Sequence, residues 1–259
     1  MLLSKLFKPA RCCMTTAALL LLGGCASASN SSYNWGWYVF NPFLPKGLSN
    51  IEFLISGVGM TLALSVSAIL ISVVMGLLLA VSLLSPYKAL RWLARSYVEC
   101  FRAIPLLVLL LWVYYGLPVV SGLQFGAFSA GVMSLALSDA AFEAEVFRAG
   151  LQSVAKGQRE AAETLGLSRW STLWYVVFPQ AIRTILPALG NQFVYVLKMS
   201  SLVSVIGLQE FTRRANELNV TEYRPLEIYT FLVFEYLLLI LLASWGVRRM
   251  ERKLAQSQH

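Results

Sequence analysis

A polar, helix-prone stretch at residues 148–174 lies inside a chain that otherwise consists largely of long apolar segments. Hydrophobic residues make up 58% of the 259 residues and charged residues only 13%. A chain of this length cannot bury so much apolar surface in its own core, so the excess must face lipid. The sequence therefore predicts an integral membrane protein in which a water-exposed helical segment is held between membrane spans.

Five apolar segments are long enough to cross a bilayer as helices. We expect these spans near residues 51–84, 104–120, 125–147, 181–205 and 225–246. The segments between the first and second and between the third and fourth spans, together with the C-terminal tail, carry most of the 21 Lys and Arg residues. Because positive residues favour the cytoplasmic side, the predicted fold is all-α with about five spans, the N-terminus outside and the C-terminus cytoplasmic.

The N-terminus has the three parts of a secretory leader. Lys5, Lys8 and Arg11 precede a short apolar core, and a polar run follows Cys25. An apolar core this short is typical of a signal peptide rather than of a span. The residues that end at Cys25 resemble a lipobox, which makes Cys25 a candidate for lipidation. An uncleaved anchor, or a start codon placed too far upstream, would give the same pattern.

The expected domain boundaries follow from these segments. We assign residues 1–25 to the leader, 26–50 to an extracytoplasmic segment, 51–247 to the transmembrane domain and 248–259 to a cytoplasmic tail. The polar loop at residues 149–179 belongs to the transmembrane domain. The sequence leaves open whether the leader is cleaved or lipidated.

The polar stretch has the composition of two helices and a turn. Residues 153–165 are rich in strong helix formers, and Gly157, Gly166 and Pro179 interrupt the stretch. Gly166 permits a sharp bend that a side chain would obstruct. From the residues alone, the prediction is a cytoplasmic helix-turn-helix between the third and fourth spans. A solvated loop helix without a partner is the alternative.

The same stretch carries a spaced motif: Glu-Ala-Ala at residues 160–162, Gly166 after three more residues, and Val176-x-Phe178-Pro179 after nine more. This spacing resembles the EAA signature of bacterial ABC importer permeases, with Val176 and Phe178 in place of the usual Ile and Leu. Flanking motifs are similar to the branch that imports polar amino acids, the histidine, glutamate and glutamine type; they lie at residues 101–106, 145–158, 178–187 and 200–207. The likeness covers about residues 57–217, and the leader lies outside it.

In that family the motif forms coupling helices that seat in a groove of a cytoplasmic ATP-binding subunit. The resemblance implies that Glu160 orients the helix against the ATPase, and that Ala161 and Ala162 permit close approach. It further implies that Gly166 sets the angle between the two helices, within a coupling loop that ends at Pro179. Replacing Gly166 by aspartate is then expected to abolish transport without preventing insertion into the membrane.

The resemblance also implies the type I importer architecture and its partners. Two permease subunits, identical or homologous, would enclose a path across the bacterial cytoplasmic (inner) membrane, and an extracytoplasmic solute-binding protein would deliver a polar amino acid. The chain contains no G-x-x-x-x-G-K-S/T pattern for nucleotide phosphates. We therefore expect a transport subunit that is not an enzyme and binds no cofactor, with ATP-Mg held by the partner ATPase. The sequence does not identify the amino acid.

Two carboxylates in the third predicted span are candidates for the substrate pathway. Asp139 and Glu143 lie four residues apart and share a helix face. Ionisable residues in spans usually face a bundle interior or a water-filled path. The alternative for Glu143 is a position near the cytoplasmic interface, where it would only snorkel.

Four further charged residues complete the set. Lys198 in the fourth span is a candidate for substrate contact or for snorkelling at the interface. Arg102 could pair with Glu145 or meet a substrate carboxylate. Glu145 and Arg148 lie three residues apart, which favours a structural ion pair.

Other function classes lack support in the sequence. Four Cys and one His predict neither a metal site nor a disulfide framework, and basic residues that flank apolar segments do not form a nucleic-acid surface. An ATP-independent secondary transporter would predict internal repeats with broken helices, and no convincing repeat is present. An intramembrane hydrolase would have to use Asp139 and Glu143, but no catalytic signature accompanies them.

Overall fold

The structure is a computed structural model that describes residues 33–256. The chain divides into two units, Met1–Gly36 and Trp37–His259. In the first unit, the Tyr33 and Trp35 rings meet edge to face with 5.4 Å between their centroids. The predicted leader, with Cys25, lies outside the described residues.

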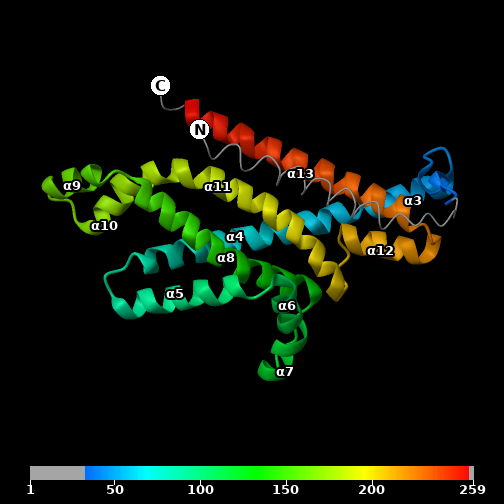
Figure 1. Cartoon of the computed structure of the whole chain (residues 1–259), viewed down its shortest axis with the longest axis horizontal. Coiled ribbons are helices and arrows are strands. Elements are labelled where there is room, and N and C mark those ends of the chain that lie inside the picture. Colours follow the sequence, from blue (N-terminus) through cyan, green and yellow to red (C-terminus); the bar gives the residue numbers. More distant parts are fainter. Residues whose placement is uncertain (1–32, 257–259) are drawn as a thin grey trace, which may run out of the picture. The chain divides into compact units, whose positions relative to one another are not determined.

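The described residues of the second unit form helices joined by short turns, with no strand among them. Four helices are long: α4 (Gly57–Leu83), α8 (Ala127–Ser153), α11 (Phe178–Met199) and α13 (Pro225–Gln256) (Figure 1). The others are η1 (Trp37–Phe40), α3 (Pro45–Ile55), α5 (Lys88–Ala103), α6 (Leu106–Leu111), η2 (Trp112–Gly116), α7 (Leu117–Ser121), α9 (Lys156–Thr164), α10 (Arg169–Thr172), η3 (Leu173–Val177), η4 (Ser200–Ile206) and α12 (Phe211–Glu222). The prediction of an all-α fold is confirmed for these residues.

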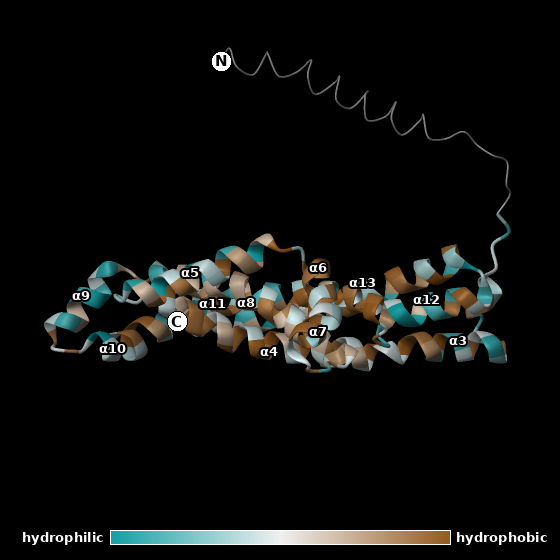
Figure 2. Ribbon diagram, turned by 90° about the horizontal axis from the view of Figure 1, so that it is seen from below, coloured by the Kyte–Doolittle hydropathy of each residue, from teal (hydrophilic) through white to brown (hydrophobic). Residues whose placement is uncertain are grey.

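Three helical segments in the described part of the chain are long and apolar enough to cross a membrane. They are Pro45–Leu83, Arg169–Ile206 and Pro225–Arg252, and a bent pair, Lys88–Ala103 with Leu106–Ser121, brings the number to four if it counts as one span. Helix α8, expected as the third span, does not reach this apolarity. It carries Asp139 and Glu143 at its centre, and 15 of its 27 residues are buried. Outside the long helices, hydrophilic colours mark α9 and α12 (Figure 2).

The region of the second predicted span differs from the expectation. Residues 85–102, expected as a connection between spans, mostly form α5, which packs against α4 and α8. Its buried residues are Ala94 and Val98. The chain then bends by 101° between α5 and α6. The bend follows from Pro105, which disfavours helical backbone at the preceding residue, and Ile104 is accordingly extended (φ −83°, ψ 124°).

Helix α8 is the centre of the fold, because it packs against α4, α11 and α5. Small side chains allow the close approach of α4. A Cβ atom added at Gly76 of α4 would lie 2.7 Å from the Cβ atom of Glu143 on α8 and 3.2 Å from the backbone nitrogen of Ala144. Glycine at position 76 is therefore a requirement of the α4–α8 contact.

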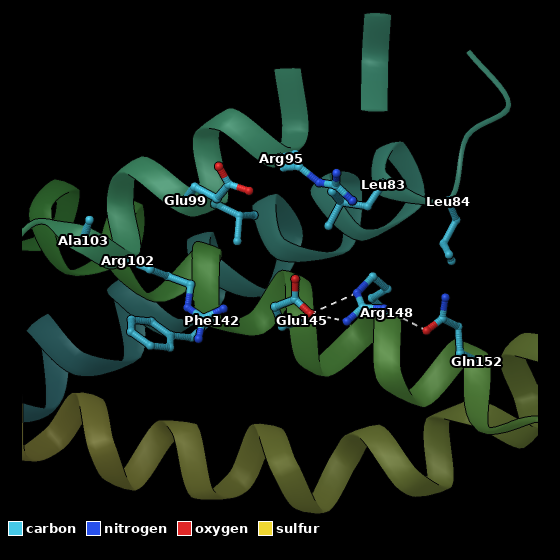
Figure 3. Close-up of a pocket in the computed structure, with 11 residues that line it drawn as sticks. Leu83, Leu84, Arg95, Glu99, Arg102, Ala103, Phe142, Glu145, Arg148 and Gln152 are labelled. Carbon is cyan, nitrogen blue, oxygen red and sulfur yellow. Dashed lines mark hydrogen bonds and ion pairs between the residues drawn. The ribbon is translucent and has the colours of Figure 1, made fainter. Parts of the chain in front are cut away.

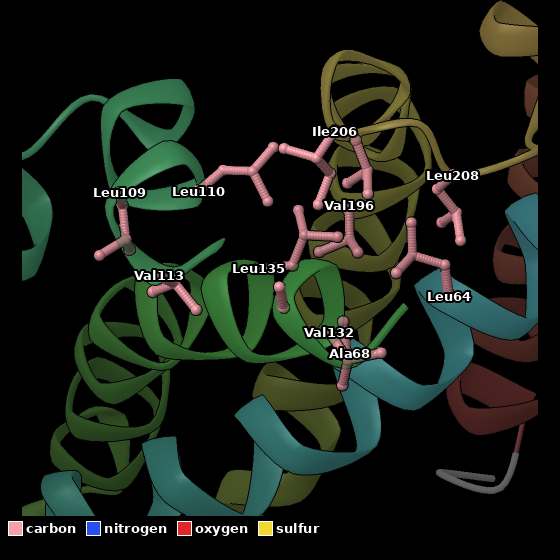
Figure 4. Packing of buried hydrophobic residues seen from close by; sticks show 12 residues of the cluster. Leu64, Ala68, Leu109, Leu110, Val113, Val132, Leu135, Val196, Ile206 and Leu208 are labelled. Carbon is pink, nitrogen blue, oxygen red and sulfur yellow. The ribbon is translucent and has the colours of Figure 1, made fainter. Parts of the chain in front are cut away.

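Three apolar clusters hold the helices together. The largest joins α4, α6, α8, α11 and η4 through residues that include Leu64, Leu110, Leu135, Val196 and Val203 (Figure 4). A second, with Phe147, Leu151, Val177 and Ile185, fixes the C-terminal half of α8 against η3 and α11. The third joins η1, α3, α12 and α13 through Val39, Leu54, Leu218 and Ile228.

A buried carboxylate caps α12 beside the third cluster. Glu210 precedes α12 and accepts hydrogen bonds from the backbone N–H of Arg213 at 2.7 Å and from the Tyr236 hydroxyl at 2.9 Å. Burial raises the pKa of Glu210, and these hydrogen bonds oppose the rise. The cap satisfies a free N–H group at the helix start, so it fixes where α12 begins.

Candidate functional site

The polar stretch forms two helices and a turn, as the sequence predicts. We call residues 156–177 the elbow; it comprises α9, a turn, α10 and the π-helical segment η3. Gly166 stands in the turn with φ +83°, in the left-handed region that favours glycine. The backbone N–H of Leu167 donates to the Ala162 carbonyl at 3.1 Å, and that of Gly166 donates to the Glu163 carbonyl at 3.0 Å. This is a Schellman closure, so the bend is set by backbone geometry.

The motif residues face different directions. Glu160 and Ala161 are exposed, whereas Ala162 is only 3% exposed and packs against its own chain. Lys156 pairs with Glu160 at 3.0 Å along the outer face of α9. Pro179 is exposed in the first turn of α11. Of the two alanines, Ala161 is thus the one that a partner can reach, and Ala162 fits the elbow to the rest of the chain.

Large apolar side chains on the elbow, which the sequence analysis did not single out, are exposed. Leu165 is 83% exposed, Tyr175 78% and Trp170 62%. Trp170 also stands edge to face with Trp174, with 5.6 Å between ring centroids. The sequence signal that could have identified them is the presence of apolar residues in an otherwise polar stretch. Their exposure marks a surface suited to a protein partner.

The elbow is attached to the spans at both ends. The Arg159 guanidinium donates to the backbone carbonyl of Leu151, which ties α9 to the end of α8. On the other side, α10 runs through η3 into α11 without a break. A displacement of the elbow would therefore move α8 and α11 together.

The two predicted pathway carboxylates on α8 are buried rather than open to a channel. Asp139 accepts a hydrogen bond from Ser72 of α4 at 2.9 Å and another from the Gln192 amide of α11. Glu143 is fully buried, and neither of its carboxylate oxygens has a hydrogen-bond partner among the residues that the structure describes. Asp139 thus joins three helices, and Glu143 does not snorkel to an interface.

Substitution of Asp139 by alanine should destabilise the protein by about 1–3 kcal/mol, because the Gln192 amide then loses its buried acceptor. Asp139→Asn retains the shape and one carbonyl acceptor, so it should lose less. The free energy of unfolding in detergent measures the difference. Equal stability of Asp139→Ala and the unsubstituted protein would contradict the role of Asp139 in joining the helices.

The other charged candidates lie apart from these carboxylates. The Arg102 guanidinium stands over the Phe142 ring, 5.3 Å from its centroid. Arg148 pairs with Glu145 at 2.6 Å and donates to Gln152 at 2.8 Å. Lys198, near the end of α11, is exposed. In the described part of the chain, no hydrogen bond or ion pair joins Arg102 or Lys198 to Asp139 or Glu143.

Comparison with known proteins shows the family to which the chain belongs. The family described as "Binding-protein-dependent transport system inner membrane component" matches residues 68–256. The chain belongs to this family. The permease is 37% identical over 205 residues to the glutamine transport system permease protein GlnP of Escherichia coli (strain K12), which covers 79% of this chain and 94% of that one. It is 34% identical over 207 residues to the arginine transport system permease protein ArtQ of Bacillus subtilis (strain 168), at 80% and 94% coverage.

A solved structure supports the same assignment. The crystal structure of an amino acid ABC transporter with histidines contains a chain that is 42% identical, covers 80% of this permease and 96% of its own length, and superimposes with a TM-score of 0.75. The predicted ABC importer permease fold is therefore confirmed, and the permease is a multi-pass component of the inner membrane. It is a transport subunit that works with solute-binding and ATPase partners. The placement of its termini stays a prediction.

Proposed function

We propose that the chain is the membrane-spanning subunit of an ATP-driven importer of a polar amino acid, and that the elbow couples it to a cytoplasmic ATPase. The glutamine and arginine permeases to which the chain is similar support the class of cargo. ATP and Mg²⁺ are bound and used by the ATPase. A second permease subunit, identical or homologous, completes the path, with the N-terminus of this chain outside and its C-terminus in the cytoplasm.

The exposed surface of the elbow is the observation that carries this proposal. Leu165 and Trp170 present apolar area to solvent, and Glu160 and Ala161 lie on the outer side of α9. Burying a side chain of this size in a groove contributes about 1.5–3 kcal/mol. The charged face beside it gives orientation rather than affinity.

The attachments of the elbow give it a mechanical role. When two ATPase subunits close on ATP, they displace the docked elbow. The Arg159–Leu151 hydrogen bond and the continuous α10–η3–α11 path carry that displacement into α8 and α11. Because α8 packs against α4 and α5 as well, a shift of α8 also changes its contacts with those two helices. No covalent bond is made or broken by this chain.

Reconstitution tests the function directly. The chain with its ATPase and solute-binding partners, in lipid vesicles, should accumulate L-glutamine or L-arginine only when ATP is supplied. Leu165→Glu should lower ATPase co-purification and ATP-driven uptake by about tenfold, because it replaces an exposed apolar side chain that docking would bury.

Leu123→Glu is the matched control. Leu123 is also exposed but lies before the start of α8, whereas the elbow follows its end. The 27 residues of α8 separate the two sites by about 40 Å. Uptake driven by an ion gradient without ATP would identify a secondary transporter, and unchanged co-purification of Leu165→Glu would place the ATPase elsewhere.

A further inference from the structure

A row of charged side chains follows one face of α5. Its members recur at intervals of three or four residues, so they share one side of the helix. They are Lys88, Arg91, Arg95, Glu99 and Arg102, and all five are exposed. The side of α5 next to this row is buried through Ala94 and Val98. Four positive charges and one negative charge on one face require water or counter-charges rather than lipid.

The inner end of this row lies beside the middle of α8. The Tyr97 hydroxyl donates to the backbone carbonyl of Leu137 at 2.8 Å, and Arg102 stands over the Phe142 ring. Phe142 is the sixteenth of the 27 residues of α8, about 20 Å from either end of that helix. Arg102, although exposed, thus lies beside the middle of α8 rather than beside an end of that helix.

A cavity of about 760 Å³ lies between the last three members of the row and α8. Arg95, Glu99 and Arg102 of α5 form one wall, and Phe142, Glu145 and Arg148 of α8 form the other (Figure 3). Its size lies in the range of ligand sites in proteins. The three guanidinium groups exceed the two carboxylates by one positive charge.

The guanidinium groups in the cavity are not equivalent. Arg148 is already bound to Glu145 at 2.6 Å and to Gln152. Arg95 and Arg102 have no carboxylate within ion-pair distance among residues 33–256. The planar guanidinium fork matches a carboxylate with two parallel hydrogen bonds. Arg102, which stands over the Phe142 ring, therefore has its donors available to a small anion.

From this geometry we infer that the cavity between α5 and α8 is a cargo site, in which Arg102 binds the carboxylate of a zwitterionic amino acid. Glu99 faces the same cavity and supplies an acceptor for the ammonium group. Phe142 provides an apolar surface beneath Arg102. This inference rests on the proposed importer function. It adds that the permease itself recognises the carboxylate of the cargo.

Thiol protection tests the site without relying on transport. Ala103 lines the cavity, so Ala103→Cys in a full-length chain that also carries Cys100→Ser places a reporter there. A membrane-impermeant thiol reagent is added to inverted membrane vesicles that contain the complete transporter, and labelling is read from the peptide that contains position 103. Excess L-glutamine or L-arginine should slow labelling several-fold, whereas the amino acid amides, which lack the carboxylate, should not.

Substitution of Arg102 supplies the second measurement. Arg102→Gln should abolish protection and lower uptake by about tenfold, the loss expected for one charged hydrogen-bonding partner. ATPase stimulation by the loaded solute-binding protein should change less than uptake does. Arg102→Lys keeps the positive charge but lacks the planar pair of guanidinium donors, so protection and uptake should lie between those of Arg102→Gln and the unsubstituted protein. Arg91→Gln is the matched control, because Arg91 belongs to the same row but lines a neighbouring hollow with Lys88 and Trp92.

The outcomes separate the site from the function. Protection that persists in Arg102→Gln, equal protection by the amides, or equal loss of uptake in Arg91→Gln would each overturn the carboxylate site. Labelling that depends on anionic lipid and not on amino acid would assign the cavity to a lipid headgroup and also overturn it. If the unsubstituted transporter accumulates no amino acid under ATP, the proposed function itself fails.

Discussion

Uptake by the reconstituted transporter should fall by about tenfold or more when Gly166 is replaced by valine, while the chain still inserts in the membrane. The elbow turns at Gly166 with φ +83°. A side chain in the left-handed region costs about 1–2 kcal/mol, and more for a β-branched residue, so the docked shape of the elbow becomes a minor population. A cost of about 1.4 kcal/mol corresponds to a tenfold change in that population.

The space around Gly166 shows that this effect comes from the backbone rather than from a clash. Apart from its two chain neighbours, no atom of the described residues lies within 4 Å of a Cβ atom added there. Gly166→Asn should therefore retain more uptake, because asparagine tolerates this backbone region better than other side chains do. Gly157→Val in α9 is the positional control, since it also meets no atom within 4 Å and has no positive φ. Normal coupling of uptake to ATP hydrolysis in Gly166→Val would contradict the role of the turn.

The second large effect is expected at the contact between α4 and α8. Gly76→Leu should lower the free energy of unfolding by about 3 kcal/mol and reduce the amount of folded protein, because overpacking forces well-packed helices apart. A single Cβ atom at this position would already lie 2.7 Å from Glu143, and 3.3 Å from the Ala140 carbonyl oxygen. Thermal unfolding in detergent and the yield of monodisperse protein measure the loss.

Gly59→Leu in the same helix is the control for this change. Gly59 is exposed, and a Cβ atom added there meets nothing within 4 Å. It should leave stability near that of the unsubstituted protein, since a surface substitution of this kind usually changes stability by less than about 0.5 kcal/mol. Equal stability of Gly76→Leu and Gly59→Leu would show that α4 and α8 are not held in this packing.

The elbow could be predicted almost completely from the sequence because its determinants are local. Polar helix formers, Gly166 and the spacing to Pro179 specify two helices and a turn without reference to the rest of the chain. The sequence did not predict which of these side chains face the rest of the chain and which face solvent. Ala162 faces inward because of where α9 packs, and the exposure of Leu165 follows from its place at the end of the same helix.

The charged residues show the opposite case. Periodicity predicted that Asp139 and Glu143 share one helix face. It did not predict that they are buried against α4 and α11. The partners Ser72 and Gln192 are 67 and 53 residues away from Asp139 in the sequence. Likewise, the positive charges of residues 85–102 indicated a loop beside the membrane, whereas α5 lies against the middle of α8 and forms a cavity with it.

Apolar content, helix-forming segments and the spaced motif thus determined by themselves that the chain is a helical membrane protein with a polar elbow. These properties depend on each residue and its neighbours within a few turns. The tertiary structure alone decided which helices meet, that the chain bends by 101° before α6, and that Arg102 faces a cavity. Those features depend on contacts between residues far apart in the sequence, and local patterns do not encode their partners.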